Sequence, residues 1–524
     1  MNVNFALLCS RWQFAPAPVL KFCLSRLTTT SRSLSISLLG SAALLLGPLL
    51  SPLQAAPLAF CQQTPAAIAQ KETLRLAALR GDREAQQRYR KVLSQHASYL
   101  RKCRSQSWPE NQALWIRLYP CDAKSGALDA VLDRIVNRGY NQVYVETFYN
   151  GKVLLPFSKN STSWPSVLQE RGLEKVDLLE QAIRKGRERG LKTYAWLFSM
   201  NFGSSYVARP DKQETIARNG LGQTSLTART VAGLSTELGQ FNPDEAFIDP
   251  YSVQARQDYA QLVKTVAQYR PDGILFDYIR YPRGYGAASV AAKVQDLWIY
   301  GEASQQVLLR RALNYKGLGL ILRFLNRGYI TTEDVNQVNV LYPKEREPLW
   351  QGLNPRQNTA SLPPSKRAAT LQAGLWQLTL AHAFQGVLDF LLAAVAPVQQ
   401  QGIAAGAVFF PDGNLNVGQG YDSRLQPWER FPKSLEWHPM SYAVCGQSNC
   451  IMAQVQRVLG AAPPGTQVKP VLAGIWQAPI SNRPPLEVQM QALYRMAPKI
   501  KSVSHFAYSW QEPGSDRERK FCQL

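Results

Sequence analysis

The stretch Arg270-Pro-Asp-Gly-Ile-Leu-Phe-Asp-Tyr-Ile-Arg-Tyr-Pro282 decides the fold. Its turn signal is followed by the apolar run Ile274–Phe276, which is typical of a strand buried on both faces. Asp277 stands at the carboxyl end of that run, where a carboxylate is costly unless it is paired or used. An acid at such a strand end is typical of the catalytic face of an α/β barrel. The alternative is a structural ion pair between Asp277 and Arg280.

Seven further runs of this kind alternate with helical patterns along the chain. The eight expected strands are Ala113–Tyr119, Gln142–Phe148, Lys192–Phe198, Gly273–Ile279, Ala404–Phe410, Glu436–Tyr442, Pro470–Trp476 and Ser504–Trp510. Eight strands that alternate with helices predict the α/β class and a closed (β/α)8 TIM barrel. The rival is an open doubly wound sheet, which usually carries a glycine-rich phosphate loop after its first strand. Residues 119–124 do not form such a loop.

Three segments precede or interrupt the expected barrel of residues 111–515. Residues 1–55 contain no Asp or Glu, and they carry four basic residues, an apolar run and a small-residue cleavage signal. This pattern predicts a secretory signal peptide or, if it is not cleaved, a signal anchor. Residues 56–110 predict a basic helical segment, either one long helix or a helical hairpin, packed on the main domain. An insertion at about 287–365, after the fourth strand, is expected to be helical over Val307–Asn326.

Charge and cysteine content indicate the environment of the protein. The 524 residues carry a formal net charge of +22, which favours an anionic partner. Because the leader predicts export to the periplasm or cell envelope, we expect an envelope polymer or an anionic membrane surface and no nucleic acid. Six cysteines lie outside the leader, and an even number in an exported chain predicts disulfides. Cys445 and Cys450 are expected to pair, and Cys61 and Cys103 flank the helical segment and could staple it. No metal or cofactor is expected, since the chain has no Cys-x-x-Cys pair and only four His.

Several blocks in order resemble the glycosyl hydrolase-like 10 family, a group of exported barrel proteins related to glycoside hydrolases. They are Gly139–Glu146, Arg189–Leu197, Phe241–Pro243 followed by Asp249, Asp272–Pro282 and Pro439–Tyr442. The resemblance covers roughly residues 111–512 and implies a TIM barrel with glycoside hydrolase activity. The chain departs from the family at Tyr278, where many members carry a second acid, and in the length of the insertion.

Glycoside hydrolysis generally needs two carboxyl groups, which in this fold must lie at the carboxyl ends of the strands. Asp277 is the expected nucleophile or electrostatic stabiliser, because related barrel hydrolases place an acid at this strand end. Asp412, after the fifth strand, is the first candidate for the general acid/base, and Glu146, near the end of the second strand, is the next. A Pro-Asp-Gly turn is the alternative for Asp412, and an ion pair in the barrel mouth is the alternative for Glu146. Glu512 also follows a strand.

Aromatic and polar residues gather at or near the expected strand ends, where sugar rings could stack and sugar hydroxyls could bind. The expected substrate-binding residues are Trp196, Asn201, Asn242, Arg280, Tyr281, Tyr442, Trp476, Tyr508 and Trp510. Arg280 would orient Asp277 or bind an acidic substituent. The sequence therefore predicts an exported glycoside hydrolase acting on a cell-envelope polysaccharide, with peptidoglycan glycan strands as the first candidate. A catalytically inactive barrel that binds envelope glycan is the alternative, and an envelope scaffold held by the basic helical segment is a third hypothesis.

Overall fold

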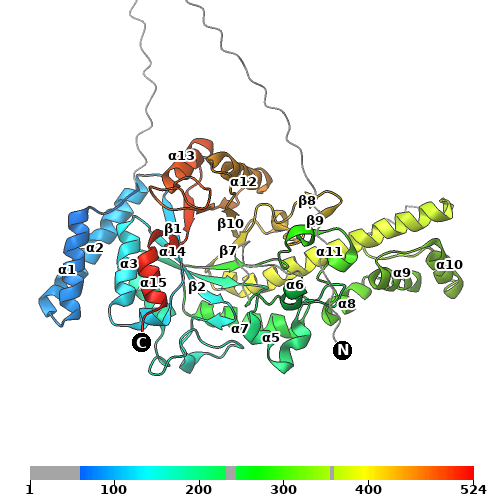
Figure 1. Ribbon diagram of the computed structural model, residues 1–524, viewed down its shortest axis with the longest axis horizontal. Coiled ribbons are helices and arrows are strands. Elements are labelled where there is room, and N and C mark those ends of the chain that lie inside the picture. The colour runs from blue at the N-terminus through cyan, green and yellow to red at the C-terminus, as the bar shows by residue number, and fades with distance from the viewer. Residues whose placement is uncertain (1–59, 232–243, 354–358, 524) are drawn as a thin grey trace, which may run out of the picture. The chain divides into compact units, whose positions relative to one another are not determined.

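A closed parallel barrel forms the centre of the protein (Figure 1). The computed structural model describes residues 60–231, 244–353 and 359–523; the leader and Asn242 lie outside them. Each barrel strand pairs with the next, and the last, β13, pairs with the first, β1. In barrel order the strands are β1 (Asn111–Ile116), β2 (Gln142–Tyr149), β4 (Lys192–Phe198), β5 (Gly273–Asp277), β7 (Ala404–Phe409), β10 (Glu436–Ser441), β12 (Val471–Ala473) and β13 (Ser502–Phe506). The predicted (β/α)8 TIM barrel is confirmed.

The barrel interior is filled by aromatic side chains. Trp115 of β1 meets Tyr144 and Trp196 edge to face, with ring centroids 4.9 and 4.8 Å apart. His438 of β10 lies 5.6 Å from Tyr144 in the same arrangement. All eight residues of β2 and all five of β5 are buried, because one face meets these rings and the other meets the surrounding helices. The interior is therefore a packed core.

Helices follow most of the strands and cover the barrel. They are α3 (Ala127–Asn137), α4 (Leu178–Glu188), α7 (Val253–Gln268), α11 (Pro364–Gln400), α12 (Ser448–Ala461), α13 (Leu486–Met496), α14 (Tyr508–Gln511) and α15 (Pro513–Lys520). Smaller elements in the connections are β3 (Lys152–Val153), α5 (Ser204–Val207), α6 (Ser225–Val231) and β11 (Gln467–Val468). A three-stranded sheet of β6 (Val290–Ala291), β9 (Gly420–Asp422) and β8 (Asn416–Val417) joins the start of the insertion to the loop after β7.

The predicted boundaries of several elements were wrong. The first, fourth and seventh strands end at Ile116, Asp277 and Ala473, earlier than expected. The eighth strand ends at Phe506, and the aromatic residues after it begin α14. An apolar run does not by itself distinguish a buried strand from a buried helix, so the pattern overran the strand. In the insertion, the expected helix Val307–Asn326 is two helices, α8 (Glu302–Leu309) and α9 (Tyr315–Arg327). The side chain of Asn314 separates them, because it accepts the backbone N–H of Gly317 at 2.8 Å and begins a new helix.

The N-terminal segment is a helical hairpin of α1 (Pro65–Leu79) and α2 (Arg83–Ser105). The chain reverses at Gly81, whose φ of +94° favours glycine. The hairpin docks on Asp133 of α3, which accepts the Tyr89 hydroxyl at 2.7 Å and Arg189 Nε at 2.9 Å. The hairpin thus packs on the barrel helices through a buried polar network.

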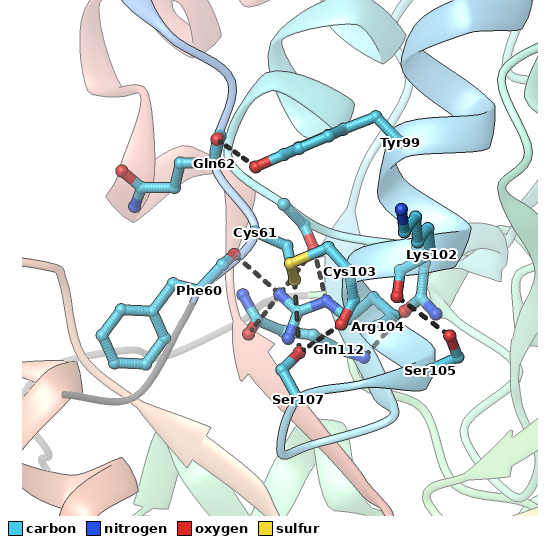
Figure 2. The surroundings of a disulfide bond; sticks show 12 residues. Phe60, Cys61, Gln62, Tyr99, Lys102, Cys103, Arg104, Ser105, Ser107 and Gln112 are labelled. Carbon is cyan, nitrogen blue, oxygen red and sulfur yellow. Dashed lines mark hydrogen bonds between the residues drawn. A yellow bond between two sulfur atoms is a disulfide. The ribbon is translucent and has the colours of Figure 1, made fainter. Parts of the chain in front are cut away.

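A disulfide between Cys61 and Cys103 fastens the start of this segment to the end of α2 (Figure 2). Beside it, the buried guanidinium of Arg104 donates to Gln112 Oε1 and to the carbonyls of Phe60 and Gly139, at 2.9, 2.9 and 2.6 Å. These bonds satisfy a buried cation with carbonyl dipoles in place of a carboxylate.

Two other disulfides join cysteines at very different separations. The expected Cys445–Cys450 bridge is confirmed, and Cys121 pairs with Cys522 across 401 residues. Next to the second bridge, Arg519 of α15 donates to both carboxyl oxygens of Asp122 at 2.7 Å. The C-terminal helix is therefore held against the segment that follows β1.

The insertion continues with α10 (Thr332–Leu341) and leads into α11, which packs along α7. Within the described ranges, α11 is the one helix that is long and apolar enough to cross a membrane, and 61% of its most apolar window is buried in the protein. It also accepts hydrogen bonds from the barrel side: the Tyr281 hydroxyl donates to the carbonyl of Ala383 at 3.3 Å. These contacts are those of a core helix.

Candidate active site

A pocket of about 940 Å³ opens at the carboxyl ends of the barrel strands. It contains all three expected catalytic carboxylates, which come from different strands. Asp277 is the last residue of β5, Glu146 lies in β2, and Asp412 follows β7 by three residues. Four of the expected substrate-binding residues line the same pocket: Trp196, Arg280, Tyr442 and Trp510.

Asp277 is a buried carboxylate, only 5% exposed. Its Oδ2 accepts Trp196 Nε1 at 3.0 Å, and its Oδ1 accepts the backbone N–H of Tyr278 at 2.6 Å. Burial raises the pKa of Asp277 to about 6, although these two hydrogen bonds and the charge of Arg280 oppose the shift. Arg280 does not form an ion pair with it, since none of the ion pairs among the described residues joins the two. The alternative for Asp277, a structural ion pair with Arg280, is therefore wrong.

Glu146 is engaged by Arg117, which extends from the end of β1. Arg117 Nη2 donates to Oε1 at 3.1 Å, and Arg117 Nε donates to Oε2. Burial lowers the pKa of Arg117, but attraction to Glu146 outweighs it and holds the pKa above its usual range. The ion pair foreseen as the alternative for Glu146 is present. A carboxylate bound by a guanidinium at both oxygens suits electrostatic stabilisation better than proton donation.

Asp412 is the least buried of the three acids, since it is half-buried whereas Asp277 and Glu146 are buried. Its Oδ2 accepts Gln454 Nε2 of α12 at 2.6 Å, and Gln454 in turn accepts the backbone N–H of Ala443 at 3.0 Å. Asp412 also stands in a turn, in which the Gly413 N–H donates to the carbonyl of Phe410 at 3.0 Å. The turn projects the half-buried carboxyl into the pocket, so its structural role is compatible with a chemical one.

Tyr278 has a left-handed backbone, with a φ of +53°. For a residue with a large side chain this costs about 1–3 kcal/mol and is concentrated at functional sites. The conformation turns the chain sharply after Asp277 and brings the Tyr278 ring 4.2 Å from that of Phe198. The Tyr278 hydroxyl donates to Glu245 Oε1 at 3.2 Å, and Glu245 and Asp516 bring the carboxylates of the pocket lining to five.

Basic residues form much of the remaining wall, and sequence reasoning missed all of them except Arg280. They are Arg117, Arg283, Arg424, Arg483 and Lys520. Arg424 forms a bidentate ion pair with Asp422, in which Nε donates to Oδ1 and Nη2 donates to Oδ2, both at 2.7 Å. Arg483 donates to the carbonyl of Tyr442 at 3.1 and 2.7 Å. Lys520 ends α15, and the other four come from connections between elements, where the sequence carries no periodic signal of direction.

Four expected substrate-binding residues lie outside this pocket. Asn201 is buried and accepts the N–H groups of Gly203 and Ala246, so it shapes a loop. Tyr281 is enclosed against α11. Tyr508 is buried, with its hydroxyl bonded to Ser515. Trp476 packs on Phe60 and donates to the Tyr140 hydroxyl at 3.2 Å. None of these four residues lines the pocket. Of the acids, Glu512 pairs with Arg138.

In the described part of the chain, no group of three or more His, Cys, Asp or Glu is arranged to hold a metal ion. The chemistry that the pocket offers directly is that of carboxylates among aromatic rings and guanidinium groups.

No protein-family model matches the chain, and no curated protein matches it. It is similar in structure to beta-galactosidase from the psychrophilic Marinomonas ef1, with a TM-score of 0.41 and 12% identity, over 76% of this chain and 54% of the other. It is also similar to the GH20 exo beta-N-acetylglucosaminidase from Vibrio harveyi in complex with N-acetylglucosamine, with a TM-score of 0.38 and 8% identity, over 81% of this chain and 58% of the other. The chain thus spans little more than half the length of these structures. At such identities and scores they assign no activity, substrate or residue role to it.

Proposed function

We propose that this protein is a glycoside hydrolase acting on a cell-envelope polysaccharide, with peptidoglycan glycan strands as the first candidate. The observation that carries the proposal is the gathering of Asp277, Glu146 and Asp412 in one pocket at the carboxyl end of the barrel. Sugar rings would stack on the aromatic walls of the pocket, to which Trp196, Tyr442 and Trp510 contribute. This constellation supplies the two carboxyl groups that glycoside hydrolysis needs.

The three acids would have different roles. Asp277, fixed by Trp196 and Tyr278, would stabilise positive charge at the reacting sugar carbon or attack that carbon directly. Asp412, with one oxygen bonded to Gln454, would donate a proton to the leaving oxygen and then take one from water. Glu146, held by Arg117, would add negative charge near Asp277, and its field indeed contributes to the raised pKa of that residue.

The test is incubation of the purified protein with isolated peptidoglycan, followed by measurement of new reducing ends. The expected result is release by the native chain and loss of release in the double variant Asp277→Asn/Asp412→Asn. Glu214→Gln serves as the matched control, because Glu214 is exposed and does not line the pocket. If the native chain and the double variant release equal numbers of ends on every envelope polysaccharide tested, the proposal is wrong.

A catalytically inactive barrel that binds envelope glycan is the second candidate. It is favoured by the occupation of both Glu146 oxygens by Arg117 and by Tyr278 at the position where the resemblance expects a second acid. Tight binding of glycan by the native chain, without cleavage, would favour this candidate over the first.

A further inference from the structure

Arg280 is a buried cation without a carboxylate partner among the described residues. The residue is 6% exposed, and within the described ranges its side chain makes one hydrogen bond, from Nη1 to the carbonyl of Tyr281 at 3.0 Å. Three other buried arginines are satisfied within the protein: Arg189 pairs with Asp133, Arg519 pairs with Asp122, and Arg104 donates to several carbonyl oxygens. A buried charge that lacks a partner is costly, so its retention points to a partner supplied from outside the chain.

Aromatic rings hold the guanidinium in place. Its central carbon lies 4.6 Å from the ring centroid of Tyr278, 5.3 Å from that of Phe247 and 5.8 Å from that of Phe410. Contacts with aromatic rings stabilise a cation without using its N–H donors. Arg280 lines the pocket, and none of its nitrogens is among the enclosed polar atoms that lack a hydrogen bond. Because Arg280 lines the pocket, an anion bound there can approach its guanidinium.

A second guanidinium adds to the positive potential at this wall. Arg424 lies 4.7 Å from the centroid of Phe410, the ring that Arg280 also approaches. Arg424 is paired with Asp422, whereas Arg280 forms no ion pair with a carboxylate of the described residues. Burial lowers the pKa of Arg280 and the charge of Arg424 adds to this effect, although the negative charges of Glu245 and Asp277 oppose it in part. A bound anion would relieve both effects.

We propose that Arg280 binds the carboxylate of an acidic sugar in the pocket, beside Asp277. The planar guanidinium fork matches a carboxylate with two parallel hydrogen bonds. The charge of Arg280 acts on Asp277, so the acidic sugar would occupy the point of cleavage or the adjoining position. Two kinds of sugar carry such a carboxylate: N-acetylmuramic acid, on its lactyl group, and the uronic acids. This inference rests on the proposed function and specifies its substrate class.

The experiment compares each acidic oligosaccharide with the same oligosaccharide after reduction of its carboxyl group to an alcohol. One arm uses N-acetylglucosamine–N-acetylmuramic acid oligosaccharides, and the other uses oligouronates. Binding is measured by calorimetry, and cleavage is measured as kcat/KM. The native chain is expected to prefer the acidic form of one source by roughly 10- to 100-fold, the range of a charge-assisted hydrogen-bond pair. In Arg280→Gln that ratio should fall towards one.

Arg310→Gln is the matched control, because it removes the same charge from an exposed residue of the insertion. It should keep the native preference. Arg280→Met, which fills a similar volume without charge, guards against a folding defect in Arg280→Gln, and the thermal midpoints of both variants are compared with that of the native chain. Equal affinity of the native chain for acidic and reduced forms in both arms overturns the inference, as does a preference that survives in both Arg280 variants. If the native chain binds the acidic form more tightly but cleaves neither form, the inference about Arg280 is supported and the proposed hydrolase activity is wrong.

Discussion

Asp277 is costly to the fold in its ionised form and useful to a reaction in the same form. Asp277→Asn keeps the shape of the side chain but removes the charge that would stabilise the transition state. We expect kcat to fall by about 10³-fold or more, with glycan affinity largely retained, because affinity depends on the pocket walls. Reducing-end release and calorimetric binding, measured on the same preparation, check this prediction. A variant with native kcat would remove Asp277 from the mechanism.

The stability of the same variant has an unusual expected sign. The folded-state pKa of Asp277 is about 6, above the roughly 3.9 of an unfolded chain, so the native state binds the proton more tightly and loses stability as pH rises from about 4 to 6. At pH 7 the variant is spared this cost of up to ~3 kcal/mol, and it loses one hydrogen bond worth about 1 kcal/mol. We therefore expect Asp277→Asn to be about 1–2 kcal/mol more stable at pH 7. Thermal midpoints at pH 4 and 7 measure this, and marked destabilisation at pH 7 would indicate a structural charge.

The rate of the reaction should report the same ionisation. If Asp277 acts as a carboxylate, kcat/KM falls roughly tenfold for each pH unit below its pKa of about 6. In Asp277→Asn this fall of kcat/KM at acidic pH should disappear, because the amide at this position does not titrate. If kcat/KM of the native chain falls only near pH 4, Asp277 is not the group whose ionisation the rate reports.

Asp412 can be tested by the choice of leaving group. Asp412→Asn should lower turnover of glycan by about 10²–10⁴-fold, because the sugar oxygen leaves poorly without a proton. Aryl glycosides with an activated phenol need no such proton, and their release should fall by less than ~10-fold. Glu146→Gln is the comparison: it should affect both substrates alike, since Arg117 holds that carboxylate. Equal losses with both substrates in Asp412→Asn would reassign the general acid.

At the scale of the elements, the strands could be predicted because each is buried on both faces. The runs around Leu275 and Val408 are short and apolar, and the run around Val143 is rich in β-branched and aromatic residues, which is typical of buried strands. The alternation of these strands with helices then predicted a closed barrel. Asp277, Glu146 and Asp412 could be brought to one end by that reasoning alone, because the carboxyl ends of parallel strands meet there.

The rest of the site depends on loops, whose paths leave no periodic pattern. Glu245 and Arg424 enter the pocket from connections before α7 and after β9. Arg117 follows β1 directly, yet its pairing with Glu146 depends on a side-chain direction that spacing does not give. Tyr281 fails in the opposite way: it stands in the signature block, but the left-handed turn at Tyr278 carries the chain away, and Tyr281 packs on α11.

The helical hairpin offers a test of how much one bridge stabilises an element. Cys61–Cys103 closes a separation of 42 residues, whereas Cys445–Cys450 closes one of 5. Since a longer loop gains more freedom when released, Cys61→Ser/Cys103→Ser should cost about 2–4 kcal/mol and Cys445→Ser/Cys450→Ser clearly less. Urea unfolding of both double variants measures the difference. Equal costs would mean that strain or solvation, and not chain freedom, sets the contribution of these bridges.

For the whole molecule, the leader remains a prediction, because residues 1–55 lie outside the described residues. We expect the mature chain to begin near Ala56 and to lie outside the cytoplasm, as the acid-free basic start and the apolar run indicate. N-terminal sequencing of the protein from its native cell, with separate periplasmic and membrane fractions, measures this. A chain that retains Met1 in the membrane fraction would indicate a signal anchor, and one that retains it in the cytoplasm would contradict export.

The bridge between Cys121 and Cys522 makes nearly the whole barrel a covalent ring, because 401 residues separate the two cysteines that it joins. A single cut by a protease anywhere within that ring, in the insertion for example, opens the ring without releasing a fragment. Both new ends stay tethered to the same particle, and the strands on either side of the cut remain paired in a closed sheet. If the chain is exported, as its leader predicts, this bridge would keep the two parts of a once-cleaved chain covalently joined.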